Sequence, residues 1–155
     1  MQHQDWMRLA LEQAWLAFEQ GEVPVGAVIK QDGQLIASAH NEKETRQDPT
    51  AHAEILALRR AAELSGSWRL PGAILYVTLE PCPMCAGAML QARIPHLVYG
   101  ATDRKGGAVE SVMNILDFRC WNHQIQVTAG ILEDECQEML QRFFTARRYN
   151  INDRA

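Results

Sequence analysis

The chain contains 155 residues, of which 47% are hydrophobic and 22% are charged, and its formal net charge is -4. This length suits one domain, because a chain of this size buries about 70% of the surface that it exposes when unfolded; we therefore expect residues 1–155 to form a single domain. The ordinary composition excludes a disordered, collagen-like or coiled-coil protein, and the negative charge excludes a strongly basic nucleic-acid binder, although one local basic patch stays compatible with it.

Periodicity and turn signals divide the chain into alternating strands and helices. Apolar residues recur every three or four positions in the first segment, which is the period of a helix, and Gly21 ends it. Asp32-Gly33 is a hairpin turn signal, Thr50 is a candidate helix cap, and Pro95 stops a short helix. In chain order we predict a helix over 6–18, strands over 23–29 and 35–39, a helix over 51–64, a strand over 73–79, a helix from 83 to about 92, strands over 96–99 and 125–128, and a last helix over 132–149.

This order of elements predicts the fold class. After the initial hairpin, strands and helices alternate, which is typical of an α/β domain with a mixed sheet and helices on both faces. Residues 100–122 have a loop-like pattern, with Gly106-Gly107 near the centre and a short turn over 112–116.

The sequence predicts neither a membrane-spanning segment nor a signal peptide. No apolar run approaches the ~20 residues that a bilayer requires. The apolar positions between Trp6 and Phe18 are interrupted by charged and amide side chains, so this segment is not the core of a signal peptide. We therefore expect a cytoplasmic protein that does not contact a membrane.

Two short motifs carry the candidate chemistry. His52-Ala53-Glu54 and Pro81-Cys82-Pro83-Met84-Cys85 each open a predicted helix. One histidine and two thiolates are three ligands for zinc, and three ligands with an open position are typical of a catalytic zinc site. An open position holds a water whose pKa the metal lowers to ~7, and Glu54 is the candidate carboxylate to take its proton.

Each motif alone has plainer interpretations. The cysteine pair could form a redox dithiol or fill a core, His52 could be an ordinary hydrogen-bonded histidine, and Glu54 a solvated helix charge. In an ideal helix, residues two positions apart point in nearly opposite directions, so the scheme requires His52 to lie at the helix end. The order H-x-E followed by P-C-x-x-C is more specific, because it matches the known signature of zinc nucleobase deaminases.

Three stretches resemble the bacterial tRNA-specific adenosine deaminase family, within the zinc-dependent cytidine/deoxycytidylate deaminase superfamily. They are residues 22–28, 48–54 and 75–89, and the resemblance extends from the first helix to Phe143-Phe144. It implies a single deaminase domain with a cytidine-deaminase-like, three-layer α/β/α fold and a mixed five-stranded sheet. It also implies a homodimer that binds the anticodon loop of a tRNA and hydrolytically converts adenosine to inosine at the wobble position.

The resemblance also assigns roles to individual residues. His52, Cys82 and Cys85 match the ligands of one zinc ion per subunit, Glu54 matches the proton shuttle, and Asn41 matches an asparagine that hydrogen-bonds the target nucleoside. Candidates for contacts with the flanking RNA are Asp103, Lys105, Arg147 and Arg148.

Plainer roles stay open for some of these residues. Asn41 also suits a turn, and Arg147 and Arg148 also suit the dipole at a helix C-terminus. The alanine-rich helices that begin near residues 51 and 83 suit either close contact between subunits or packing on the chain's own sheet. The roles of Cys120 and Cys136 are left unassigned.

Two other functions compete with tRNA deamination. A small-molecule deaminase acting on guanine, cytosine or a free nucleoside would use the same zinc chemistry, and the acidic net charge favours it. A non-catalytic zinc module would have no use for Glu54 beside the metal, and Glu54 therefore argues against it. The resemblance favours the tRNA deaminase over both.

Overall fold

The structure, a computed structural model, describes the backbone of residues 1–152 and the side chains of residues 1–148. Its elements are α1 (His3–Glu19), β1 (Gly26–Gln31), β2 (Gln34–His40), α2 (Lys43–Arg46), α3 (Ala53–Ser65), β3 (Ala73–Leu79), α4 (Pro83–Gln91), β4 (His96–Ala101), the 3-10 helix η1 (Ile115–Asp117), β5 (Gln126–Thr128) and α5 (Glu133–Asn152). We predicted one domain over residues 1–155. The end of that range lies outside the described residues, so the prediction of a single domain remains a prediction.

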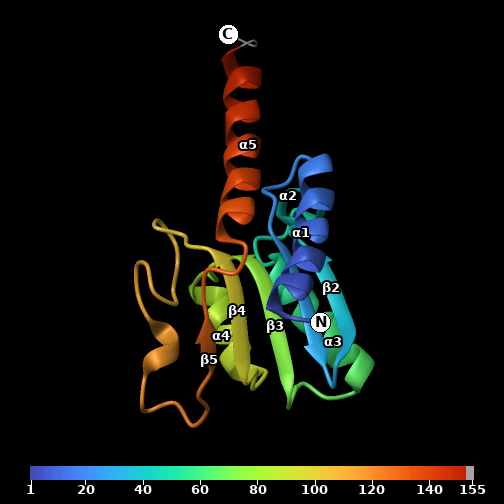
Figure 1. The fold of residues 1–155 in the computed structure, drawn as a ribbon, viewed down its shortest axis with the longest axis vertical. Coiled ribbons are helices and arrows are strands. Elements are labelled where there is room, and N and C mark those ends of the chain that lie inside the picture. The colour runs from blue at the N-terminus through green and yellow to red at the C-terminus, as the bar shows by residue number, and fades with distance from the viewer. Residues whose placement is uncertain (153–155) are drawn as a thin grey trace.

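The sheet is mixed and has five strands in the order β2-β1-β3-β4-β5. β1 pairs antiparallel with both β2 and β3, whereas β3, β4 and β5 run parallel. α1 lies on one face of the sheet and α3 and α4 lie on the other (Figure 1). The expected three-layer α/β/α fold is therefore confirmed.

Successive residues on the central strands enter two different cores. Ile29, Leu75 and Leu97 face the layer of α3 and α4, whereas the neighbouring Tyr76 and Val98 face α1. Strands with two buried faces have nearly continuous apolar sequences, which explains why Ala73–Leu79 was predicted with its observed boundaries. The small residues of the alanine-rich helices, among them Ala57, Ala61 and Ala86, are fully buried against the chain itself.

The structure corrects two local predictions. Thr50 does not cap α3: the N-cap residue is His52, and Thr50 instead donates its N–H and its hydroxyl to Asp48 Oδ1 at 2.8 and 2.7 Å. The first strand begins at Gly26 and not at residue 23. Gly26 lies directly against α1, where a Cβ atom would collide with the backbone carbonyl of Ala10. The short helix α2 was not predicted, because its four residues are too few to show a helical period.

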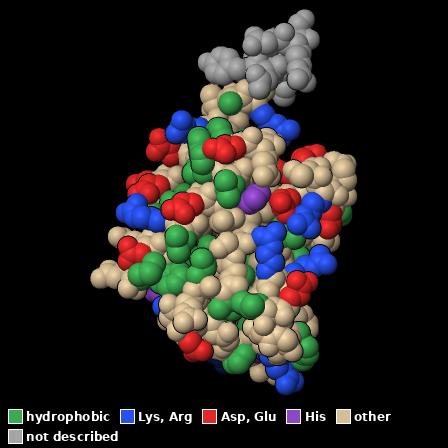
Figure 2. Space-filling model, turned by 90° about the vertical axis from the view of Figure 1, so that its right-hand side faces the viewer, with side chains coloured by type: hydrophobic (Ala, Val, Ile, Leu, Met, Phe, Trp, Pro, Cys, Tyr) green, Lys and Arg blue, Asp and Glu red, His purple; other side chains and the backbone are tan. Residues whose placement is uncertain are grey.

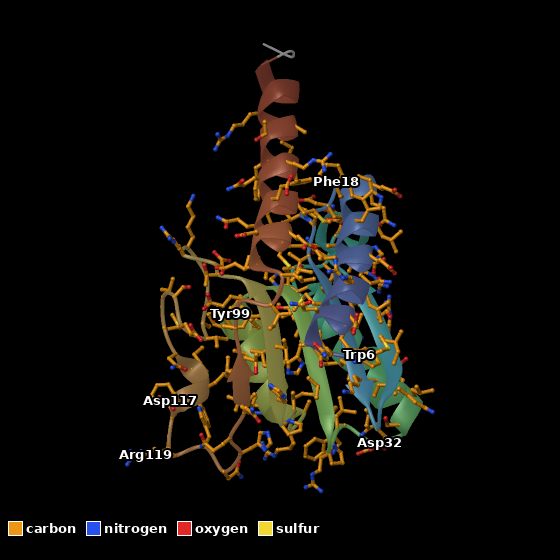
Figure 3. All side chains as sticks on the ribbon, viewed as in Figure 1. Trp6, Phe18, Asp32, Tyr99, Asp117 and Arg119 are labelled. Carbon is orange, nitrogen blue, oxygen red and sulfur yellow. The ribbon has the colours of Figure 1, made fainter. Side chains whose placement is uncertain are left out.

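Several segment ends meet at one end of the sheet. The start of β1 lies beside the end of β2 and near the end of β3, because Gly26 pairs with His40 and Ala27 with Val77. Asp32, in the β1–β2 turn, marks the opposite end (Figure 3). Strand β5 runs parallel to β4, and α5 follows β5. α5 therefore begins at the end of the sheet where β4 ends, and it extends away from the sheet (Figure 1).

The surface charge and the hydropathy of the helices complete the description of the fold. Basic and acidic side chains are intermixed on the face around the β2 edge, with no large area of one sign (Figure 2). Within residues 1–152, none of the helices has the combination of length and hydropathy that crossing a bilayer demands.

Candidate active site

One histidine and two cysteines meet where α3 and α4 begin. His52 is the N-cap residue of α3 and has extended backbone angles of φ -73° and ψ 152°. Cys82 is the N-cap residue of α4, and Cys85 lies in its first turn. The geometric requirement for H-x-E is thereby met, because His52 lies just outside the regular helix and its side chain is free to turn toward the cysteines.

The distances between these side chains fit a zinc ion. His52 Nδ1 lies 3.6 Å from Cys82 Sγ and 3.5 Å from Cys85 Sγ. With Zn–N near 2.0–2.1 Å and Zn–S near 2.3 Å, a tetrahedral site separates nitrogen from sulfur by about 3.6 Å. Among the described residues, no other histidine, cysteine or carboxylate joins this group. The donor set therefore suits a metal with one position open.

The environment of the cysteines favours a thiolate. The hydrogen bond with Cys85, followed by that with His52, lowers the pKa of Cys82 to about 4 against the opposing effect of burial. The bond with Cys82 and burial raise the pKa of Cys85, because the pair shares one negative charge. The N-terminus of α4 adds a positive partial charge. Thiolate is the form that binds a metal.

Glu54 is buried beside this group. The side chain is 4% exposed although it follows the N-terminus of α3 by one residue only. Burial raises the pKa of Glu54, because a charged carboxylate loses hydration there. A carboxyl group with a raised pKa accepts a proton more readily and can pass it on to another group.

A cavity of about 160 Å³ connects these residues with the substrate candidates. Asn41 and Asp103 line it together with His52, Glu54 and Cys82. Its remaining lining residues are Val23, Val25, Lys43, Ala53, Leu79 and Glu80. The sequence-predicted nucleoside-binding residue and one of the RNA candidates thus lie in the same cavity as the metal group.

Asn41 serves the fold and faces the cavity at once. Its Nδ2 donates to the carbonyl of Val23 at 3.2 Å, and its Oδ1 accepts from the N–H of Lys43 at 3.1 Å. These bonds confirm that it is a turn residue and also fix its amide. An amide has two donors and two lone pairs, so one of each remains for a ligand.

The basic candidates lie outside the cavity lining. Lys105 is exposed on the loop after β4, and Arg147 and Arg148 are exposed on α5. The guanidinium of Arg147 lies 5.4 Å from the ring centroid of Phe143. Their contact with RNA stays a prediction.

Among the lining residues that sequence analysis did not assign to the site, two are charged, Lys43 and Glu80. Lys43 lies between the predicted strand over 35–39 and the predicted helix over 51–64, where the sequence indicated no element. Glu80 follows strand β3 directly and is 2% exposed. A charged residue at the end of an apolar strand, immediately before a metal-ligand motif, was the available signal. Burial raises the pKa of Glu80, but hydrogen bonds from Ser111, Glu110 and Asp103 outweigh this effect and lower it overall.

Fold and site together define a protein class. A helix-covered mixed sheet, with H-x-E at the start of one helix and C-x-x-C at the start of the next, is the arrangement of the cytidine-deaminase-like proteins. Residues 1–148 match the family model of the MafB19-like deaminases. The tRNA-specific adenosine deaminase of Bacillus subtilis is 50% identical over 143 residues, which are 92% of this chain and 89% of that protein. The chain belongs to this deaminase family, among the tRNA-specific adenosine deaminases.

Solved structures agree with this assignment. A structure from a study of A-to-I editing by tRNA:A34 deaminases is 50% identical, with a TM-score of 0.84 over 87% of this chain and 98% of that chain. The guanine deaminase of Nitrosomonas europaea is 27% identical, with a TM-score of 0.75 over 90% of this chain and 83% of that chain. The shared fold therefore serves different substrates in different relatives.

Proposed function

We propose that this chain catalyses the zinc-dependent, hydrolytic deamination of adenosine to inosine at the wobble position of a tRNA anticodon. One observation carries the proposal: His52, Glu54 and Cys82 line a single cavity in a chain that is 50% identical to a tRNA-specific adenosine deaminase. We place the reaction in the cytoplasm.

Three side chains would hold the metal. His52, Cys82 and Cys85 supply one nitrogen and two sulfurs at separations that suit one zinc ion per chain. Zinc held in this way activates water as a nucleophile at neutral pH. Burial excludes bulk water from Cys85 and Glu54, which strengthens the electrostatic interactions between them.

Glu54 would move the protons of the reaction. It would take one proton from the attacking water and deliver it to the ring nitrogen of adenine; the second proton of that water, on the new hydroxyl group, would then pass through Glu54 to the departing amine. Water thus supplies the oxygen of inosine, and ammonia leaves. Asn41 would hold the base through the donor and the acceptor that its turn leaves free.

The substrate class is tested with an anticodon stem-loop that carries adenine at the wobble position. We expect rapid inosine formation from the stem-loop and little reaction with free adenosine, guanine or cytosine, because binding energy from flanking nucleotides raises turnover. Glu54→Gln is the matched inactive control. Equal turnover of a free base or nucleoside would instead establish the small-molecule deaminase.

We also propose that the enzyme is a homodimer, as the family resemblance implies. An apolar groove of about 530 Å³ between α3 and α4 supports this, with Ile55, Leu58, Ala62, Trp68 and Ala88 among its lining residues. Trp68 is 58% exposed in the single chain. Light scattering should give twice the chain mass, and Trp68→Glu should shift the protein toward the monomer. A fully active monomer at micromolar concentration would contradict the dimer.

A further inference from the structure

The carboxylate of Glu80 organises the loop that borders the cavity. We call residues 103–111 the rim loop. Within the part of the chain that the structure describes, the carboxylate accepts five hydrogen bonds, and all of them come from this loop. Oε1 accepts from the N–H of Asp103 at 3.1 Å and from the hydroxyl of Ser111, and Oε2 accepts from the N–H groups of Val109, Glu110 and Ser111 at 3.2, 2.8 and 3.0 Å.

The rim loop is wrapped closely around this carboxylate. A Cβ atom on Gly107 would collide with Cδ and Oε2 of Glu80, and it would lie 2.6 Å from the carbonyl oxygen of Asp103. The N–H of Ala108 also donates to the carbonyl of Pro81 at 2.8 Å. The rim loop therefore rests on the segment that leads directly into the metal ligand Cys82.

Hydrogen bonds hold both the backbone and the side chain of Asp103. Its backbone N–H is held by Glu80, and its Oδ1 accepts from the N–H groups of Lys105 and Gly106, both at 3.1 Å. Its Oδ2 accepts no hydrogen bond from the described residues, and Asp103 is one of the residues that line the cavity. Glu80 thus holds the backbone of a cavity-lining residue, Asp103, whose carboxylate keeps one oxygen without a hydrogen bond from the described residues.

We propose that Glu80 is the positioning residue for recognition of the RNA beside the target base: it holds Asp103 where the carboxylate accepts a hydrogen bond from a flanking nucleotide. A ribose hydroxyl or a base amino group is the chemistry that donates to a carboxylate. This inference rests on the proposed function. We assign Glu80 no role in the proton transfers, because both oxygens of its carboxylate already accept hydrogen bonds from the rim loop.

The substitution Glu80→Gln is designed to remove the hydrogen bond from the Asp103 N–H and to keep the other hydrogen bonds of this side chain. The amide oxygen of glutamine takes the place of Oε2 and accepts from Val109, Glu110 and Ser111. The amide NH₂ then faces the Ser111 hydroxyl, which can accept as well as donate. Only the N–H of Asp103 loses its acceptor. Ser111→Ala is the matched control, because it removes the other partner of Oε1 and leaves Asp103 bound.

Two readouts test the proposal on the zinc-loaded enzyme. In Glu80→Gln we expect faster hydrogen exchange at the Asp103 amide and a KM for the stem-loop raised about five- to tenfold, as expected for one weakened hydrogen bond, with kcat within about twofold. Ser111→Ala should change neither. Asp103→Asn should raise KM similarly, and the double variant should add little, because both changes remove one interaction.

Each contrary result has a distinct meaning. Unchanged exchange at Asp103 overturns the positioning role, whatever the substrate is. Faster exchange with an unchanged KM overturns the link to RNA. Wild-type protein that leaves the stem-loop unreacted overturns the proposed function instead. If Glu80→Gln does not fold, Gly107→Ala displaces the same loop and gives the second measurement.

Discussion

Glu54 combines a charged side chain with nearly complete burial, next to three residues of metal-ligand type. We expect Glu54→Gln to lower kcat at least about 10²-fold, because general acid–base catalysis contributes roughly 10²–10⁴. Its zinc content should equal that of the wild type, since Glu54 is not a ligand. Single-turnover deamination and elemental analysis of the same preparation measure both. An active variant would remove the proton-shuttle role, and a variant without metal would make Glu54 structural.

The three ligand candidates predict a defined stoichiometry. Elemental analysis should find one zinc per chain in the wild type and almost none in a Cys82→Ala, Cys85→Ala double variant, because a single histidine cannot retain the ion. Cys120→Ser is the control, since Cys120 is an exposed free cysteine. Zinc retained by the double variant would place the metal elsewhere.

The buried carboxylate of Glu22 anchors the short helix α2 near the site. It is 1% exposed and accepts from the N–H groups of Glu44 and Thr45 at 3.0 and 2.8 Å, which fixes α2. Burial raises the pKa of Glu22, but the hydrogen bonds from Thr45 and Glu44 outweigh it, so the folded-state pKa lies below the usual value. A carboxylate of this kind stabilises the fold above its unfolded pKa and loses that contribution as the pH falls through the folded pKa.

Glu22→Gln should therefore be destabilising in a pH-dependent way. At pH 7 we expect a free energy of unfolding lower by about 1–3 kcal/mol, the cost of weakening buried hydrogen bonds to a charged group. The difference should shrink as the pH falls below the usual glutamate pKa of about 4.3 and then through the lower folded-state pKa of Glu22. Urea titrations at both pH values measure it. Glu19→Gln, an exposed position at the end of α1, is the control; a constant difference across the pH range would contradict the assignment.

At the scale of elements, α5 contacts the end of α1 near the middle of its own length and extends beyond the sheet. Phe18 at the end of α1 lies beside α5 (Figure 3), and its ring meets that of Phe143 edge-on at a centroid distance of 5.9 Å. Sequence periodicity predicted this helix within a few residues of its observed start. It could not indicate the direction of α5, because only the parallel pairing of β4 and β5 sets where α5 begins.

At the scale of the whole molecule, the chain has a net charge of -4, yet its RNA substrate is also negatively charged. We expect few phosphate contacts and hence a shallow dependence of affinity on salt. If Arg147 and Arg148 supply two of them, the Arg147→Ala, Arg148→Ala variant should weaken stem-loop binding and reduce the slope of log K against log salt by about 1.4, near 0.7 for each single-stranded phosphate. Arg119→Ala, at the far end from α5 (Figure 3), is the control. An unchanged slope would exclude both arginines from the interface.

Sequence by itself determined the order of the main strands and helices and predicted which residue types form the candidate site. Both are local properties: hydrophobic period selects a helix or a strand, and ligand type selects a metal. His52, Cys82 and Cys85 were predicted as a group for that reason. Thr50 was assigned wrongly as a cap because its competing partner, Asp48, satisfies it locally.

Only the tertiary structure decided which separated segments meet. Strand order, and the end of the sheet at which the helices begin, decide three features of the site. These features are the extended backbone of His52, the burial of Glu54 and the cavity that Asn41 and Asp103 share. The attachment of the rim loop to Glu80 joins residues 23 to 31 positions apart. Contacts at such separations leave no period or spacing in the sequence, because they arise when the chain packs into one core.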